Sequence, residues 1–410
     1  MEEYSHPLIE STNSHSNDTQ RRVYKRRWII LTIVSLINIC NAAVWISMAP
    51  VADKAAHFYE TDQNNIDLFS SIFFVSTIVI GFIAIWIVDR NGLMLGIYLG
   101  SILNALGISL RALSSADFIV NSLTLSKRSQ FIVAIVGQMI AGLAQPFVLF
   151  SPTKVAELWF STNQRAFATT ITGMSNPMGI VLGTIISPLI VTTSNKIPLL
   201  SIVWCIPSVV TLSSKPPTPP SDSAEIVNST PYFTAIKELF KQKAYLMLLL
   251  YMGCGVGMFS ALITILEEIL ESKGYDDSFA SVCTAIMIGS GVLGAAAVSH
   301  VVDRNKRYMT AMKLSVGLTA IAINGLLVSF NYSDIKHIIS IFCAIFGFFG
   351  FMSYPLGLEL GIECSFPVVP EATSSGFLMI CGQIQGIIFT YLSTQLANTQ
   401  KFFNNIGVNL

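Results

Sequence analysis

The residues best suited to contact a solute are polar and aromatic side chains inside long apolar segments. Asn41 and Trp45 lie four positions apart near the end of the first such segment, so a helix would place them on one face. Because polar groups are costly inside a bilayer, they are candidates for function. An indole ring can offer its face to a cation. Trp45 therefore predicts one wall of a cation site, and the alternative is a tryptophan at the membrane interface.

Amide side chains mark three further apolar segments, at Gln145, Asn176 and Gln383. Amides can orient a polar solute through hydrogen bonds without the cost of a buried charge. The alternative interpretation is that they join helices to one another. We therefore predict a site to which the two halves of the chain both contribute amides.

Charged residues recur at matching places between apolar segments. The tetrapeptide Val-Asp-Arg-Asn occurs at 88–91 and again at 302–305, 214 positions later. An aspartate there can accept hydrogen bonds from a helix N-terminus and pair with arginine. The alternative is an ordinary charged turn. The pattern predicts a gate at this end of the molecule, with these residues in it: Asp89, Arg90, Asp303 and Arg304.

Two more coincidences support an internal repeat. Glu-x-x-Phe occurs at 157–160 and at 363–366, an offset of 206, and Asn176 matches Gln383 at an offset of 207. The first half is basic at this end and the second half is acidic, which predicts ion pairs between the halves; ordinary loop charge is the alternative. The residues expected to pair are Lys154 and Arg165 with Glu363 and Glu371, together with Glu359.

The elements that must position these residues are membrane-spanning helices, each needing about 20 apolar residues. Eleven segments qualify: 28–50, 66–88, 93–113, 130–152, 166–191, 197–213, 244–266, 279–302, 308–330, 336–358 and 372–396. We predict a polar tail at 1–27, a first six-helix bundle at 28–213, a linker with an amphipathic stretch at 214–243, and a second bundle of five spans at 244–410. The sixth span is short, and a twelfth is expected to be missing.

Composition excludes the other classes of protein. Of 410 residues, 52% are hydrophobic and 12% are charged, and the mean hydropathy is +0.62. A soluble domain carries about 25% charged residues, and a disordered chain is not hydrophobic. An all-α polytopic membrane protein remains. The net charge of zero gives no reason to expect a nucleic-acid partner.

Motifs for catalysis and cofactors are missing from the sequence. The seven cysteines form no CxxC pair, and no glycine-rich nucleotide loop, HExxH or nucleophile elbow occurs. We therefore expect no cofactor, no metal and no enzyme activity. The sequence predicts a carrier driven by solute gradients.

Loop charges predict the orientation. With the N-terminus in the cytoplasm, sixteen of the 24 Lys and Arg residues fall on the cytoplasmic side. The eight assigned to the other side are Lys54, Arg111, Lys127, Arg128, Lys196, Lys273, Lys336 and Lys401. The sequon at Asn331 would then face outward and is a candidate for glycosylation. The sequence leaves open whether the membrane is the plasma membrane or an internal one.

Several short motifs together resemble solute carrier family 49 of the major facilitator superfamily, the family of the feline leukaemia virus subgroup C receptor-related proteins. They are Tyr24-Lys-Arg-Arg-Trp28, Asn41-Ala-Ala-Val-Trp45, Ala144-Gln-Pro-Phe147, Glu157-Leu-Trp-Phe160, Asn176-Pro-Met-Gly179 and Glu363-Cys-Ser-Phe-Pro367. The resemblance implies a major facilitator fold of two bundles. It also implies that Trp45, Gln145 and Gln383 surround the ammonium group of choline or ethanolamine. Phe259 stands where these relatives have a tyrosine.

The expected function is a monomeric carrier of a small organic cation that opens alternately to either side of the bilayer. One alternative is export of haem, which the resemblance also brings in; the five histidines all lie in the tail, in loops or at span ends. The other alternative is a receptor or scaffold that transports nothing.

Overall fold

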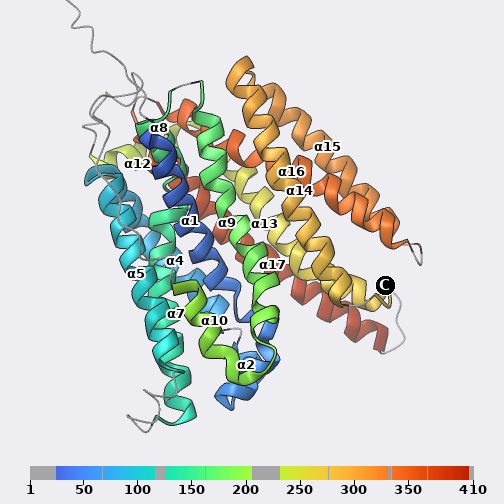
Figure 1. Cartoon of the computed structure of the whole chain (residues 1–410). Coiled ribbons are helices and arrows are strands. Elements are labelled where there is room, and N and C mark those ends of the chain that lie inside the picture. The colour runs from blue at the N-terminus through green and yellow to red at the C-terminus, as the bar shows by residue number, and fades with distance from the viewer. Residues whose placement is uncertain are drawn as a thin grey trace, which may run out of the picture.

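The computed structural model describes residues 25–66, 68–115, 125–161, 163–205, 231–275, 277–330, 332, 335–366 and 368–405. Within these ranges the fold is helical (Figure 1). The first bundle contains α1 (Arg26–Ile46), η1 (Ala49–Val51), α2 (Ala52–Tyr59), α3 (Gln63–Ile66), α4 (Leu68–Arg90), α5 (Leu93–Leu113), α7 (Lys127–Leu149), α8 (Pro152–Trp159), α9 (Arg165–Ile190), η2 (Ser194–Lys196) and α10 (Ile197–Cys205). The linker helix α12 (Tyr232–Lys241) follows. The second bundle contains α13 (Lys243–Ser272), α14 (Asp277–Asn305), α15 (Tyr308–Ser329), α16 (Lys336–Ser365) and α17 (Glu371–Asn405).

Ten of these helices are long and apolar enough to cross a membrane, five in each bundle of the described chain. They match ten of the eleven predicted spans. The sixth span is described only as α10, because residues 206–213 lie outside the described ranges, as does Asn331. Three helices run well past their predicted ends: α16 continues to Ser365 instead of ending at 358, α17 to Asn405 instead of 396, and α13 to Ser272 instead of 266. The first extension keeps Glu359 and Glu363 on a helix.

Local sequence explains several helix boundaries. The side chain of Ser126 accepts a hydrogen bond from the backbone N–H of Ser129 and caps α7. Pro152 occupies the first turn of α8, where its missing N–H costs nothing. Between α4 and α5, Gly92 takes a φ of +98°, a conformation that favours glycine. The matching turn between α14 and α15 uses Lys306 at a φ of +53°.

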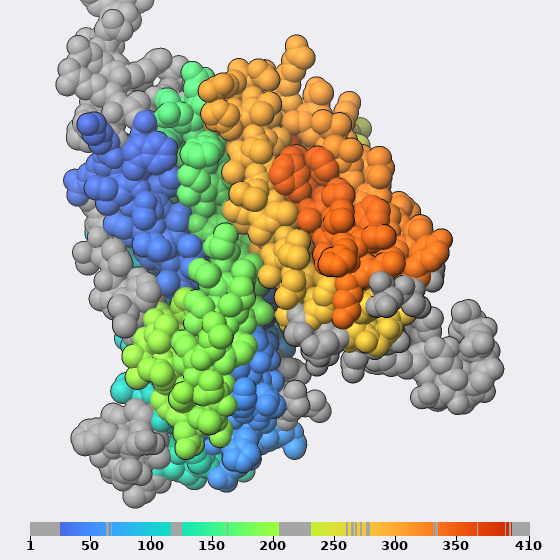
Figure 2. Space-filling view, turned by 45° about the vertical axis from the view of Figure 1, so that its right-hand side comes forward, coloured from blue at the N-terminus to red at the C-terminus, as the bar shows by residue number. Residues whose placement is uncertain are grey.

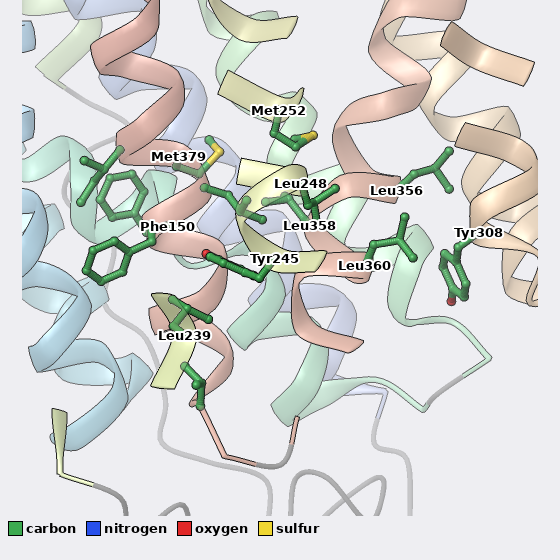
Figure 3. Close-up of a cluster of buried hydrophobic side chains, with 14 of the residues drawn as sticks. Phe150, Leu239, Tyr245, Leu248, Met252, Tyr308, Leu356, Leu358, Leu360 and Met379 are labelled. Carbon is green, nitrogen blue, oxygen red and sulfur yellow. The ribbon is translucent and has the colours of Figure 1, made fainter. Parts of the chain in front are cut away.

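The two bundles share an apolar core at one end of the molecule, where α8 and α12 lie. This cluster unites Ile85 and Phe150 of the first bundle, Leu239 of α12, and Tyr245 and Met379 of the second bundle (Figure 3). Burial of apolar side chains is the main favourable term in such contacts. We call this end the closed end and the opposite end, where α2 lies, the open end.

The helix axes of the two bundles diverge from the closed end toward the open end (Figure 1). In the space-filling view α9 and α14 touch beside the closed end (Figure 2). Every hydrogen bond found between the bundles, within the described residues, lies at the closed end. The structure is therefore a state that is shut at one end.

Candidate functional site

Two aspartates join the bundles at the closed end. Each lies near the end of a helix in one bundle and accepts hydrogen bonds from the first turn of a helix in the other bundle. Asp89 of α4 accepts hydrogen bonds from the backbone N–H of Ala372 (3.3 Å) and the hydroxyl of Thr373 (2.6 Å), in the first turn of α17. A carboxylate at a helix N-terminus is favourable because it satisfies free N–H groups and meets the positive end of the helix dipole.

Asp303 of α14 does the same for α9. Its two oxygens accept hydrogen bonds from the backbone N–H groups of Ala166 (3.1 Å) and Phe167 (2.9 Å). The two copies of the repeated tetrapeptide thus cap helices in opposite bundles. The two bundles are therefore joined at two contacts, one between α4 and α17 and one between α14 and α9.

Between these caps, an ion pair joins residues at matching positions of the repeat. Arg165 Nη1 lies 3.2 Å from Glu371 Oε1, and both side chains are buried. Nearby, Thr169 donates to Glu359 (2.8 Å) and Thr153 shares a hydrogen bond with Ser375 (2.8 Å). Buried charges are tolerated when they are paired and hydrogen-bonded.

Lys154, on α8, pairs within its own half rather than across the gate. Its Nζ lies 2.7 Å from Glu157 Oε2 and 3.9 Å from Asp89 Oδ1. Burial alone would lower the pKa of Lys154, but the carboxylates of Glu157 and Asp89 outweigh it and hold the pKa above its ordinary value. The expected pairing of Lys154 with an acid of the second half is therefore wrong for this state.

Three other expected gate residues stand outside the network. Arg90, Arg304 and Glu363 are exposed, and for none of them does the described part of the chain supply a hydrogen bond or ion pair. Asp89 and Asp303 are satisfied by backbone N–H groups and a hydroxyl, so neither needs an arginine. The polar network at the closed end consists of Asp89, Asp303, Arg165, Glu371 and Glu359 with their hydroxyl partners.

Removing either cap is expected to open the closed end. In Asp89→Ala or Asp303→Ala, two bonds to a helix start are lost, a change worth about 1–2 kcal/mol, or roughly 5–30-fold in the ratio of closed to open molecules. Spin labels on cysteines at the exposed positions 90 and 304, in a background without other accessible cysteines, would report the distance between the bundles.

The matched control is Asp53→Ala, since Asp53 is an exposed acid in the first turn of α2 at the open end. It should leave the distance distribution unchanged. A distribution in Asp303→Ala that equals that of the parent protein would contradict the role of the cap.

The candidate solute site begins with an aromatic pair on the first bundle. Trp45, in the last turn of α1, is half-buried and meets Phe74 of α4 edge to face, with ring centroids 4.8 Å apart. Its Nε1 is buried without a hydrogen-bond partner among the described residues. An indole with a free N–H and a partly accessible ring can serve a ligand with both polar and cationic parts.

Gln145 of α7 lies deeper in the same bundle, against the same helix α4. Its Oε1 accepts from the hydroxyl of Thr77, and that hydroxyl is also 3.4 Å from the carbonyl of Gly142. Pro146 follows Gln145 inside the helix and has no N–H, so the Gly142 carbonyl lacks its usual partner. Among the described residues no acceptor was found for the amide nitrogen of Gln145, which leaves that nitrogen free to donate.

The depth of Gln383 in the molecule can be compared with that of Gln145, because α17, which carries Gln383, packs against α4, which carries Thr77. A Cβ on Gly81 of α4 would lie 3.1 Å from Ile380 of α17, so these positions touch. Gln383 lies three residues beyond Ile380, and Thr77 lies four residues before Gly81. Both steps are about one turn toward the open end. The half-buried Gln383 therefore stands at roughly the depth of Thr77 and Gln145, from the opposite bundle.

Two expected binding residues serve as contacts between helices. Asn41 is fully buried, and its amide donates to Asn104 Oδ1 (2.9 Å) and to the carbonyl of Ala141 (3.1 Å). Asn176 is half-buried and donates to Asn38 (3.3 Å). Both join α1 to its neighbours, so neither is carried into the proposed site.

The sequence analysis counted Arg111, at the end of the predicted span 93–113, only among the charges on the outer side. The guanidinium of Arg111 is fully buried at the end of α5 and donates to Gln138 Oε1 (2.9 Å), Ser47 Oγ (3.0 Å), Ser201 Oγ (3.1 Å) and the Val44 carbonyl (3.3 Å). No carboxylate among the described residues pairs with it. The sequence held one signal for a buried Arg111: it lies seven residues after Asn104, so both fall on the same face of one predicted span.

Gln138 completes this arrangement around the end of α1. Its amide nitrogen lies 3.2 Å from the Phe69 carbonyl and 3.4 Å from the carbonyls of Val44 and Trp45. Arg111 and Gln138 thus hold the last turn of α1, which carries Trp45. The C-terminal end of a helix favours a cation, so the buried guanidinium is partly compensated there.

Aromatic residues of the second bundle are placed by α13 and α16. Phe259 packs against Phe351 (ring centroids 4.6 Å apart) and Phe346 (6.5 Å). It is half-buried within its own bundle, with no contact to the first bundle among the described pairs. Tyr354 of α16, which the sequence analysis did not single out, approaches Gly173 of α9: a Cβ there would lie 2.7 Å from its ring.

No metal centre was found: the described residues contain no group of three or more His, Cys, Asp or Glu side chains that could hold a metal ion. The described histidines His57, His300 and His337 are all exposed. The candidate site thus consists of amides, a hydroxyl and aromatic rings.

These features define a membrane transporter of the major facilitator type, with two helical bundles of membrane-spanning length that are joined at one end. The sequence profile of the Major Facilitator Superfamily matches residues 25–390, and the chain belongs to that superfamily. Within it the chain belongs to solute carrier family 49. It is 36% identical over 400 residues to solute carrier family 49 member A3 of Xenopus tropicalis, covering 95% of this chain and 82% of that protein.

More distant relatives carry names that state a substrate. The human choline/ethanolamine transporter FLVCR2 is 28% identical over 398 residues, covering 92% of this chain and 73% of the relative. Among solved structures, the major facilitator superfamily transporter FucP in the outward conformation matches with a TM-score of 0.70 at 14% identity, covering 92% of this chain and 93% of that one. The structural match confirms the fold.

Proposed function

We propose that this protein transports a small organic cation of the choline and ethanolamine type by alternating access. The observation that carries the proposal is that Thr77 and Gln145 of one bundle lie at about the depth of Gln383 of the other. Trp45 packs against Phe74 of the same helix α4, nearer the open end. The indole face suits a quaternary or primary ammonium group, and the amides suit the hydroxyl. The substrate named for the FLVCR2 relative supports this class.

The proposed orientation places the N-terminus and the closed end in the cytoplasm. Positive residues are concentrated on that side, as expected for cytoplasmic loops. The state described here would then be shut toward the cytoplasm and accessible from outside. Transport would require the caps at Asp89 and Asp303 to break while the bundles close at the other end.

The test is uptake of labelled choline and ethanolamine by the full chain in proteoliposomes, which does not depend on the native membrane. We expect saturable uptake that excess choline blocks. The neutral isostere 3,3-dimethylbutan-1-ol should not compete, because it has the shape of choline without the charge. Equal competition by this alcohol, or no uptake above empty liposomes, would contradict the proposal.

A further inference from the structure

The linker helix α12 lies deeper than a loop helix at the surface would. It begins after Pro231, and the hydroxyl of Tyr232 donates to the backbone carbonyl of Phe82 on α4 (3.0 Å). Phe82 precedes Arg90, the last residue of α4, by eight positions, which is about 12 Å along a helix. The side chain of Tyr232, at the start of α12, therefore reaches the spanning part of α4.

The surface of α4 at this depth faces lipid. Its exposed apolar residues are Val75, Val79, Phe82, Ile83 and Trp86. Phe233, next to Tyr232, is 83% exposed, which is unusual for a phenylalanine unless an apolar medium surrounds it. An exposed ring on an amphipathic helix at this place is suited to enter the acyl chains near the headgroups.

The exposed face of α12 combines apolar and cationic side chains. Phe233, Lys237, Phe240 and Lys241 fall on one face by their spacing and all are exposed, whereas Ala235 on the other side is buried. Lysines on such a helix reach toward phosphates while the rings enter the acyl boundary. Lys241 is partly neutralised by Glu238 (2.6 Å), and Lys237 has no carboxylate within ion-pair distance among the described residues.

Phe240 and the buried Leu239 of α12 touch both bundles where α4 meets α17. Phe240 meets Phe377 of α17 with ring centroids 5.6 Å apart, and Phe377 meets Phe82 of α4 at 5.7 Å. Leu239 belongs to the same apolar cluster as Ile85 of α4. Any interaction that stabilises α12 in this position therefore also stabilises the contact between α4 and α17.

We propose that α12 is a membrane-interface strap that binds anionic phospholipid through Lys237, Lys241 and Phe233, and that this lipid favours the state shut at the closed end. The partner is a lipid because the helix presents rings at acyl depth together with cations at phosphate depth. A soluble anion would use the cations alone.

Contact with lipid is tested by a fluorophore on a cysteine at position 233, in a background without other accessible cysteines. Phospholipids with bromine on the upper acyl chain should quench it strongly. The same fluorophore at position 53, exposed on α2, should be quenched less than half as much. Equal weak quenching at both positions would overturn the proposal.

The effect of lipid charge is tested with spin labels at positions 90 and 304 on the full chain. Raising phosphatidylserine from zero to about a third of the lipid, at constant ionic strength, should increase the ratio of closed to open molecules at least two-fold. The double variant Lys237→Gln/Lys241→Gln should lose this response, whereas Lys273→Gln/Lys336→Gln, at the open end, should keep it.

Two outcomes would overturn the lipid assignment. One is a double variant that responds to phosphatidylserine as the parent does. The other is the same shift produced by soluble inorganic phosphate in neutral phosphatidylcholine, which would assign the lysines to a water-soluble anion. Neither readout depends on choline uptake, so failure here is distinguishable from failure of the proposed substrate.

Discussion

Uptake of choline is expected to fall to background when Trp45 is replaced by alanine. The half-buried indole packs edge to face against Phe74 of α4, the helix that also carries Thr77, and this contact orients its ring. A desolvated cation–π contact is worth about 2 kcal/mol, or roughly 30-fold in affinity. Trp45→Phe keeps a weaker ring face and should retain part of the uptake with a raised KM.

The matched control for Trp45 is Trp86→Ala, because Trp86 is an exposed tryptophan on the lipid-facing side of α4. It should transport at close to the parental rate. Surface-expressed Trp45→Ala that transports choline with an unchanged KM would show that the indole does not bind the cation.

Replacing Arg111 with methionine is expected to lower thermal stability and raise KM together. The substitution removes the buried donor of Gln138 Oε1, Ser47 Oγ and Ser201 Oγ, whereas the Val44 carbonyl still accepts from the hydroxyl of Ser47. Each buried polar group left unpaired costs about 1–3 kcal/mol. Because the same bonds fix the last turn of α1, Trp45 would also lose its position.

Two further variants distinguish an effect on the position of Trp45 from a general loss of thermal stability. Arg128→Met removes an exposed cation at the same end and should behave as the parent. Arg111→Met combined with Gln138→Leu removes the stranded acceptor and should recover melting temperature more than KM. The measurements are the melting temperature in detergent and the KM and kcat of uptake. An unchanged KM in Arg111→Met would show that the arginine does not act through Trp45.

Hydrophobic segments along the sequence are enough to predict the fold and ten of its spans, because lipid requires long apolar helices whose backbone groups are satisfied internally. The repeated tetrapeptide also predicts a gate, and both of its aspartates lie in the network at the closed end. The arginines of the same motif, Arg90 and Arg304, are exposed and take no part in this network. The repeated Asp-Arg pair predicts a charged turn after each helix, but it does not specify whether the aspartate or the arginine is buried.

The sequence by itself determined that this protein is a bundle of lipid-embedded helices with a duplicated plan and a few polar residues inside it. Only the tertiary structure decided which of those residues meet. Asp89 caps a helix 283 positions away, and Arg165 pairs with Glu371 across 206. Packing also buries Asn41 and Arg111 and gives each of them hydrogen-bond partners on other helices. The physical reason is that a span needs only apolar length to enter the bilayer, whereas polar partners are chosen by the packing of helices distant in the chain.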